Sequence, residues 1–444
     1  MVAHNDERPP QQAGAPLSLD DRWALLRPWT PLFFVACFLL LAFAKTPDLF
    51  LNPRFWAEEG RDFFPALRDG SLLNDLMYIT KGSYQVLTNL AVFIATRVPL
   101  EYAPAVTTYI ALLLHTIVAF QIGLSVRALQ IPIAAGLMMI VAWAFLPQTY
   151  EVWLTATNIQ WVTGVSVLLL FFLPGPVIER HTRLAIVWAL ICGFSGVPAT
   201  ITAPVFFARA ILQRSRPLTY VSVALFLCAA IQLAVIATHG TPEREYLADP
   251  VVLTAPFVLQ SILAPLFSAE FATGVGQAIK IYWPSIGAVF IGTMASGGVI
   301  LALLLRISRD EAKDGLSRYV LAMWILVTLV QTFGSLNAPV LLSGWAGGRY
   351  FLFGSMCMCI LLALASRSDV AFDRRWGLGL LLVICIVGVS QRYTSPWVEL
   401  LVSGPSWRDQ LRSCDPVEGC RITIWPGSGW SIDVRPHDLT IRKK

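Results

Sequence analysis

Long apolar runs recur along most of this chain, and they constrain its fold more than any other feature. Runs of about 18 to 25 residues match the length of a helix that crosses a bilayer. They begin near Trp29 and continue to about residue 390. Of the 444 residues, 56% are hydrophobic and 14% are charged. Because only helices and closed barrels satisfy backbone polar groups in lipid, we predict an all-α polytopic membrane protein.

The basic residues indicate how such a chain is oriented. The formal net charge is +5, and Lys and Arg gather in short segments between apolar runs, as at 179–183 and 306–318. Basic loops of this kind stay on the cytoplasmic side, so the charge indicates orientation and not nucleic-acid binding. We predict a bacterial-type inner (cytoplasmic) membrane protein with its N-terminus cytoplasmic and its C-terminus extracytoplasmic.

One short apolar run decides on which side of the membrane each later loop is predicted to lie. Val86–Val98 has 13 residues, which as a helix reach about 20 Å across a hydrocarbon core of about 30 Å. We therefore predict a juxtamembrane helix at the surface, since counting this run as a span would reverse the side of every later basic cluster. The remaining runs give about eleven transmembrane helices, at 29–45, 103–126, 131–147, 161–174, 184–196, 204–213, 217–238, 284–305, 319–335, 350–366 and 376–390.

The segments outside the spans divide the chain further. Residues 1–28 are polar and rich in Pro and Gln, which predicts a disordered cytoplasmic tail. Residues 29–392 form the membrane domain, with an extracytoplasmic loop at 46–85. The sequence Ala42-Phe43-Ala44 at the end of the first span also fits a signal-peptide cleavage site, which is the alternative interpretation of that span.

Residues 393–444 predict a small extracytoplasmic cap. Arg421–Trp425 alternates in polarity and is followed by Pro426-Gly427, as is typical of a strand and a turn. Cys414 and Cys420 lie in this polar segment and could form a disulfide in an oxidising compartment. The other six cysteines lie inside apolar runs, where packing is their expected role.

A dense polar cluster follows the first span directly. Glu58, Glu59 and Arg61 lie among aromatic residues at the expected edge of the bilayer. A carboxylate there can have its pKa raised and act as a base, although it could also bind a metal or form a solvated loop mouth. Adjacent residues of a helix point about 100° apart, so the two glutamates are expected to have different roles.

Other polar residues concentrate at the outer ends of the spans, whereas mid-span positions are apolar apart from three neutral or weakly basic residues. Charged mid-span residues usually mark a transport pathway, so this distribution favours an enzyme that works at the outer face. The three mid-span residues are His115, Gln121 and Gln232. The candidate substrate-binding residues are Arg61, Asn158, Gln160, His239, Lys280, Arg349 and Tyr350.

In arrangement and in short motifs, the chain resembles the GT-C superfamily of polytopic glycosyltransferases, which use sugars carried on polyprenyl phosphate. Members carry an acidic pair in the first outer loop, as Glu58-Glu59 does here, followed by a surface helix like Val86–Val98. A late span often opens with Arg-Tyr, and Arg349-Tyr350 is similar. The chain has Glu where the first acidic residue is usually Asp, which leaves the subfamily and the acceptor open.

The resemblance implies roles for these residues. Glu58 would be the base, and Glu59 would orient the acceptor, assist an arginine or bind a divalent cation. Arg349 would hold phosphate, because a guanidinium offers fixed paired donors, and its alternative is an interfacial anchor. Lys280 and His239 are weaker phosphate candidates. Asn158, Gln160 and the neighbouring Trp161 would line a sugar pocket, unless Trp161 anchors to headgroups.

The functional hypothesis is an inverting transfer of a sugar from a polyprenyl-phosphate carrier to an extracytoplasmic glycan, lipid or protein acceptor. A carrier or flippase for lipid-linked sugars is the main alternative, and an envelope scaffold is a third. The sequence has no P-loop and no metal-ligand spacing, so no metal site is predicted and a divalent cation is the one cofactor considered.

Overall fold

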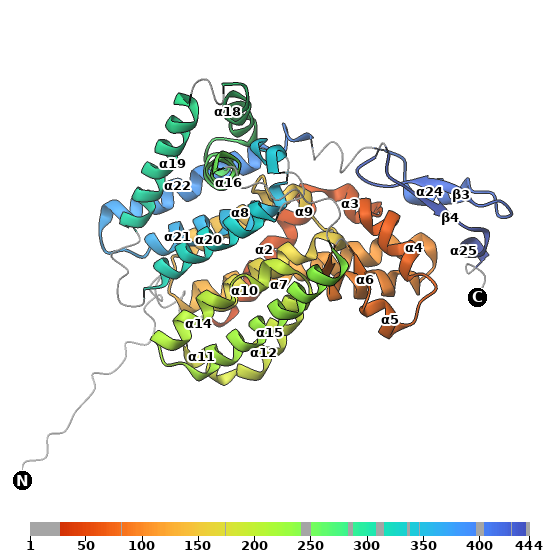
Figure 1. Cartoon of the computed structure of the whole chain (residues 1–444), viewed down its shortest axis with the longest axis horizontal. Helices are drawn as coiled ribbons and strands as arrows, with labels where there is room; N and C mark the ends of the chain where they lie inside the picture. Colours follow the sequence, from red (N-terminus) through yellow and green to blue (C-terminus); the bar gives the residue numbers. More distant parts are fainter. Residues whose placement is uncertain are drawn as a thin grey trace, which may run out of the picture.

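The computed structural model describes residues 27–80, 82–173, 175–240, 250–282, 287–307, 315–334, 338–345, 347–396, 404–427 and 429–440. It is mostly helical, with a small hairpin near the C-terminus, as Figure 1 shows. The apolar helices form the bulk of the molecule, and α4 to α6 lie with the C-terminal elements at one end. The predicted tail at 1–28 falls outside the described residues except for Arg27 and Pro28.

The helices of the bundle follow the apolar runs closely. Within the described ranges, four helical segments are long and apolar enough to cross a membrane: Leu100–Ala128, Arg216–His239, Leu316–Phe333 and Gly348–Ala365. They contain α7 (Ala103–Ala128), α15 (Arg216–His239), α20 (Leu316–Phe333) and η8–α21 (Gly348–Phe351, Leu352–Ala365). The rest of the bundle is built from α2 (Thr30–Lys45), α8 (Ile133–Phe145), α10 (Ile159–Phe171), α12 (Thr182–Phe194), α14 (Ala203–Leu212), α19 (Ala288–Ile307) and α22 (Ala371–Ser390).

This confirms a mostly helical chain with several apolar helices of membrane-spanning length. The finer count of eleven crossings stays a prediction. Between α15 and α19 the chain forms α16 (Pro250–Val258), η5 (Leu259–Leu263), α17 (Ala264–Leu266) and α18 (Ala269–Tyr282).

The segment at 46–85, which we call the first outer segment after its predicted location, is folded throughout most of its length. It contains α3 (Pro47–Leu51), η2 (Glu59–Phe63), α4 (Phe64–Leu67), α5 (Leu72–Leu76) and the hairpin of β1 (Ile79–Thr80) with β2 (Ser83–Tyr84). The next helix, α6 (Val86–Thr96), has 11 residues, which reach only about 17 Å.

Helix α6, which the sequence predicts as a juxtamembrane helix, buries one side against neighbouring segments. Thr88 Oγ1 donates to the carbonyl of Ala156 at 2.8 Å, and Asn89 Nδ2 donates to the carbonyls of Leu76 and Tyr78 at 3.2 and 2.8 Å. The helix thereby joins α5, the first outer segment and the segment before α10.

The C-terminal cap contains the predicted hairpin. Strands β3 (Cys420–Thr423) and β4 (Ser431–Val434) pair antiparallel, between α24 (Trp407–Arg412) and α25 (Pro436–Thr440). Cys414 and Cys420 form a disulfide. The cap shares one hydrophobic core with the first outer segment and α6, made of Phe55, Phe63, Phe64, Leu67, Val92, Ala95, Leu100, Ala103, Trp407, Leu411, Ile422, Ile424, Ile432 and Val434. The cap and the outer segment are therefore one packed unit.

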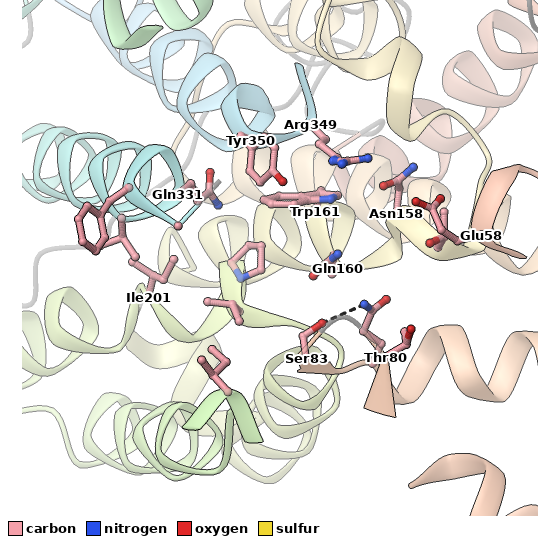
Figure 2. A pocket seen from close by; sticks show the side chains of 18 of the residues that line it. Glu58, Thr80, Ser83, Asn158, Gln160, Trp161, Ile201, Gln331, Arg349 and Tyr350 are labelled. Carbon is pink, nitrogen blue, oxygen red and sulfur yellow. Dashed lines mark hydrogen bonds between the residues drawn. The ribbon is translucent and has the colours of Figure 1, made fainter. Parts of the chain in front are cut away.

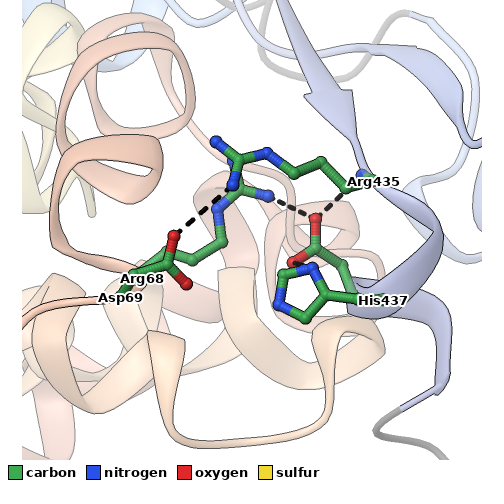
Figure 3. A network of polar contacts seen from close by, with 5 residues as sticks. Arg68, Asp69, Arg435 and His437 are labelled. Atoms are coloured by element: carbon green, nitrogen blue, oxygen red, sulfur yellow. Dashed lines mark hydrogen bonds and ion pairs between the residues drawn. The ribbon is translucent and has the colours of Figure 1, made fainter.

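Polar contacts reinforce this junction, as Figure 3 shows. Arg68 forms a buried ion pair with Asp438, and both side chains are 7% exposed. Asp438 Oδ2 also accepts a hydrogen bond from the backbone N–H of Arg435 at 2.8 Å, and Asp438 Oδ1 lies 3.5 Å from His437 Nδ1. Arg435 also lies 3.4 Å from Asp69.

The three polar mid-span residues all contact neighbouring groups, although His115 Nδ1 has no hydrogen-bond partner among the described residues. Gln121 Oε1 accepts from Ser166 Oγ at 2.7 Å, and His115 Nε2 lies 3.4 Å from the carbonyl of Val152. Gln232 of α15 accepts from the N–H of Tyr84 at 3.0 Å and donates to its carbonyl at 2.8 Å. Gln232 therefore ties the β1–β2 hairpin to the bundle.

Candidate functional site

A cavity of about 290 Å³ lies where the first outer segment, the segment before α10, α15, α20 and η8 meet. Five of the predicted site residues line it: Glu58, Asn158, Gln160, Arg349 and Tyr350. Trp161 lines it as well. Residues nearly 300 positions apart in the sequence thus share one cavity, which Figure 2 shows from close by.

The cap sets the conformation of the loop that carries Glu58. Trp425 N donates to the carbonyl of Phe55 at 3.0 Å, and Ala57 N donates back to the carbonyl of Trp425. Ala57 itself has φ +34°, an uncommon backbone conformation for a residue with a side chain. The chain therefore turns sharply just before Glu58 and is held there by pairing with the cap.

Gly60 allows the cap to approach this closely. A Cβ at position 60 would lie 2.7 Å from Ile424 Cδ1 of the cap, closer than carbon atoms normally come. The absence of a side chain at Gly60 lets Ile424 pack directly against the acidic loop.

Glu59 lies behind the cavity wall and is 1% exposed. Its Oε1 accepts from the N–H groups of Ala156 and Thr157, the latter at 3.1 Å. Its Oε2 accepts from Trp56 N and Thr107 Oγ1, both at 3.3 Å. Burial raises the pKa of this carboxyl to about 7, against the opposing effect of these hydrogen bonds. Glu59 therefore fastens the acidic loop to the segment that carries Asn158.

Arg349 is held by a carboxylate that the sequence analysis did not single out. Its guanidinium lies 2.8 Å from Glu151 Oε1, and its backbone N–H donates to Glu151 Oε2 at 3.1 Å. Glu151 belongs to the short helix α9 (Thr149–Val152). Asn158 Nδ2 donates to the Glu151 carbonyl at 2.9 Å. One acidic residue thus positions both the guanidinium and an amide of the cavity.

Aromatic side chains form the middle of the cavity wall. The rings of Trp161 and Tyr350 meet edge to face with their centroids 4.9 Å apart. Gln160 is packed closely against Gly196, where a Cβ would lie only 2.3 Å from the Cβ of Gln160. Flat aromatic faces beside amides are suited to contact with a ring that carries hydroxyl groups.

The two ends of the cavity differ in polarity. Glu58, Asn158 and Arg349 lie toward one end in Figure 2, whereas Ile201 lies toward the other, together with the uncharged amide of Gln331. The apolar lining also includes Val197, Pro198, Leu233, Ile236, Val330 and Phe333. Leu233 is 65% exposed and Phe333 47% exposed, so the apolar end reaches the outside of the bundle. The cavity therefore suits an amphipathic ligand.

Three predicted residues lie elsewhere. Arg61 pairs with Asp62 at 2.7 Å and stacks 4.1 Å over the ring of Trp430 in the cap. His239 and Lys280 are exposed, on α15 and α18. None of the three belongs to the described lining of the cavity.

The sequence analysis missed part of the lining. Thr80, Ser83 and Gln85 enter the cavity from the β1–β2 hairpin, where Gln85 Nε2 donates to Ser83 Oγ at 3.0 Å, and Gln331 enters from α20. Of these residues, only Ser83 and Gln85 could have been suspected from the sequence, because they lie in a polar stretch that follows the acidic loop. Across the described ranges, no group of three or more His, Cys, Asp or Glu residues could hold a metal ion.

Comparison with known proteins shows no family model that matches this chain, and no matching curated protein or solved structure.

Proposed function

We propose that this chain is a multi-pass membrane glycosyltransferase of the GT-C type, which transfers a sugar from polyprenyl phosphate to an extracytoplasmic acceptor. The observation that carries the proposal is the cavity that combines Glu58, Arg349, two amides and an aromatic wall with an apolar lining toward one end. A lipid-linked sugar likewise combines a hydroxylated ring, a phosphate and a hydrocarbon chain.

Each part of that donor has a counterpart in the cavity. Arg349 supplies N–H donors for the phosphate, and its pairing with Glu151 fixes its direction. Trp161 and Tyr350 offer flat faces to the sugar. The hydrocarbon chain leaves past Leu233 and Phe333, whose exposed side chains would face lipid in a membrane.

The proposed reaction is a direct displacement with inversion. Glu58 takes the proton of the acceptor hydroxyl as its oxygen bonds to the anomeric carbon. The bond from that carbon to the phosphate oxygen breaks, and polyprenyl phosphate leaves with the bonding electrons. Arg349 stabilises the negative charge that develops on the phosphate. Glu59 acts as a positioning residue, because its four hydrogen bonds hold the loop that carries Glu58.

Sugar transfer in membranes tests the proposal. Membranes that contain the wild type, Glu58→Gln or Arg349→Ala are supplied with labelled polyprenyl-phosphate sugars and native envelope acceptors. We expect each variant to lose about a hundredfold or more of the transfer rate. The matched controls are Asp48→Asn and Arg412→Ala, which change a carboxylate and a guanidinium that lie outside the cavity lining.

The same assay separates the alternatives. A carrier or flippase would move labelled lipid across vesicles without forming a new glycosidic bond, and Arg349→Ala would impair that movement. A scaffold would tolerate Glu58→Gln. Full transfer by Glu58→Gln at normal expression would overturn the proposed mechanism.

A further inference from the structure

The wall of the cavity carries a buried amide that makes no hydrogen bond to any described residue. Gln331 of α20 is 5% exposed, and neither its Nε2 nor its Oε1 has a partner in the described part of the chain. The residue lines the cavity of about 290 Å³, which is close to the lower end for small-molecule sites, about 300 Å³. Room for a ligand therefore lies beside the open amide.

This amide lies away from the charged groups of the cavity. Helix α20 packs against η8, and Figure 2 shows Gln331 on the side of Tyr350 that faces away from Arg349. Among the described lining residues, only Glu58 and Arg349 carry a full charge, and both lie at the opposite end. A ligand group that reaches Gln331 is therefore expected to be uncharged.

A second open group lies on the same wall and differs in its chemistry. Trp161 is 7% exposed, and its Nε1 has no acceptor within the described ranges. Figure 2 shows this nitrogen on the side of the indole nearer to Arg349. An indole N–H only donates, whereas an amide donates and accepts. The group that only donates thus lies toward the end proposed for the phosphate, and the group that also accepts lies toward the uncharged end.

The apolar part of the lining comes mainly from other elements. On α13 (Val197–Thr200), at the residue after it and on α15, the lining side chains are Val197, Pro198, Ile201, Leu233 and Ile236. A hydrocarbon chain is best accommodated against these side chains, because burial of apolar surface is favourable. The place left for a hydroxylated ring is the wall of Trp161, Tyr350 and Gln331.

We propose that the Gln331 amide binds two neighbouring hydroxyl groups of an uncharged sugar ring, on the side of the ring away from the phosphate. One hydroxyl accepts from Nε2 and the other donates to Oε1, so a single ring satisfies both amide atoms. The inference rests on the proposed function, because it takes the sugar of the polyprenyl-phosphate donor as the ligand. Water has the same hydrogen-bonding chemistry, and water in place of the sugar is one outcome of the test.

Binding to the full chain, in a detergent without a sugar headgroup, tests the contact. Farnesyl phosphate and its glucosyl, mannosyl and arabinosyl esters are titrated into wild type, Gln331→Leu and the control Gln277→Leu, whose side chain is exposed on α18. We expect wild type and the control to bind at least one ester more tightly than farnesyl phosphate. Gln331→Leu should lose about tenfold in affinity for that ester and none for farnesyl phosphate, which also shows that the variant is folded. Equal affinity of the wild type for all four probes, as expected if water occupies the amide, would overturn the proposal.

Deoxy analogues of the preferred ester locate the contact. Removing a hydroxyl that meets Gln331 should weaken binding to wild type by about three- to tenfold and leave binding to Gln331→Leu unchanged. Losses that add to that of the variant for every hydroxyl away from the anomeric carbon would overturn the contact. The glucuronyl ester carries a carboxylate, so it should bind at least about tenfold more weakly than the glucosyl ester. Equal affinity for these two esters would contradict an uncharged ligand.

Sugar transfer measured on the same preparations separates this inference from the proposed function. Gln331-dependent binding of a sugar ester without any transfer would support the sugar contact and overturn the transferase. Transfer by the wild type, together with full affinity of Gln331→Leu for the donor, would overturn the contact alone.

Discussion

Glu59 and Gln331 are side chains of equal length, both buried beside the same cavity, and they differ in their partners. Glu59 accepts hydrogen bonds from Trp56, Thr107, Ala156 and Thr157. Gln331 has neither its donor nor its acceptor satisfied within the described residues. A buried polar group without a partner costs about 1 to 3 kcal/mol. This cost is avoided at Glu59, whose hydrogen bonds are made within the protein, but not at Gln331.

Buried polar side chains in this protein are therefore of two kinds. Where buried polar groups find partners across the fold, as at Glu59 and at the Arg68–Asp438 pair, they hold segments in place. Where a buried amide that lines the cavity has no partner in the described part of the chain, as at Gln331, it is available to a molecule that enters the cavity. Three experiments test this distinction.

The largest effect is expected at the junction of the cap and the outer segment. Asp438→Ala leaves the buried guanidinium of Arg68 without its counter-ion, which should lower the free energy of unfolding by about 3 to 5 kcal/mol. Asp433→Ala is the control, because its pair with Arg421 spans 4.0 Å and its side chain is 86% exposed. That variant should unfold like the wild type. Equal denaturation curves for the two variants would show that the junction does not depend on the buried pair.

A pH-dependent effect is expected at Glu59. Its pKa is about 7 in the folded chain, against about 4.3 when unfolded, so the folded state retains a proton that the unfolded state has lost. Stability from this group is complete below the unfolded pKa and is lost as the pH rises through about 7, by about 4 kcal/mol in total.

The measurement is Tm against pH for wild type and Glu59→Gln. The difference between the two curves should change between about pH 4 and 8, with the wild type losing more stability as the pH rises. Parallel curves would exclude the raised pKa, although a uniformly lower Tm of the variant would still report the lost hydrogen bond to Trp56.

The smallest effect separates two glutamines that are both buried. Gln232→Leu removes the bonds to Tyr84 and Gly193, and should cost about 2 to 3 kcal/mol because it orphans backbone groups. Gln331→Leu orphans no described group of the protein and should cost less than about 1 kcal/mol. Chemical denaturation of both variants checks the ranking, and the reverse order would make Gln331 part of the framework.

The apolar patterns predicted the helices well because hydrophobicity is a local property. Residues 103–126 and 217–238 were expected as spans, and α7 and α15 extend over Ala103–Ala128 and Arg216–His239. The alternation at 421–425 likewise marked the cap hairpin. The charge of Arg349 also indicated a site residue, but the sequence did not indicate that Glu151 is its partner.

The partners of these residues could not be predicted in this way. Glu151 meets Arg349 across 198 positions of sequence, and Ala156 and Thr157 meet Glu59 across nearly 100. Such pairs depend on how helices pack, which no local period encodes. The sequence predicted different roles for Glu58 and Glu59, and the packing of the fold turns Glu58 toward the cavity and buries Glu59.

The pairing of Trp425 with Phe55 and Ala57 also has a consequence for biosynthesis. Arg68 and Asp438, in the same junction, are 370 positions apart, which the ribosome needs roughly 20 to 70 s to cover at ordinary elongation rates. Throughout that interval the acidic loop lacks the neighbours that bend it at Ala57. The acidic wall of the cavity is thus completed last, after the apolar helices have been made, so a nascent chain stalled before the cap would already contain the bundle without a finished site.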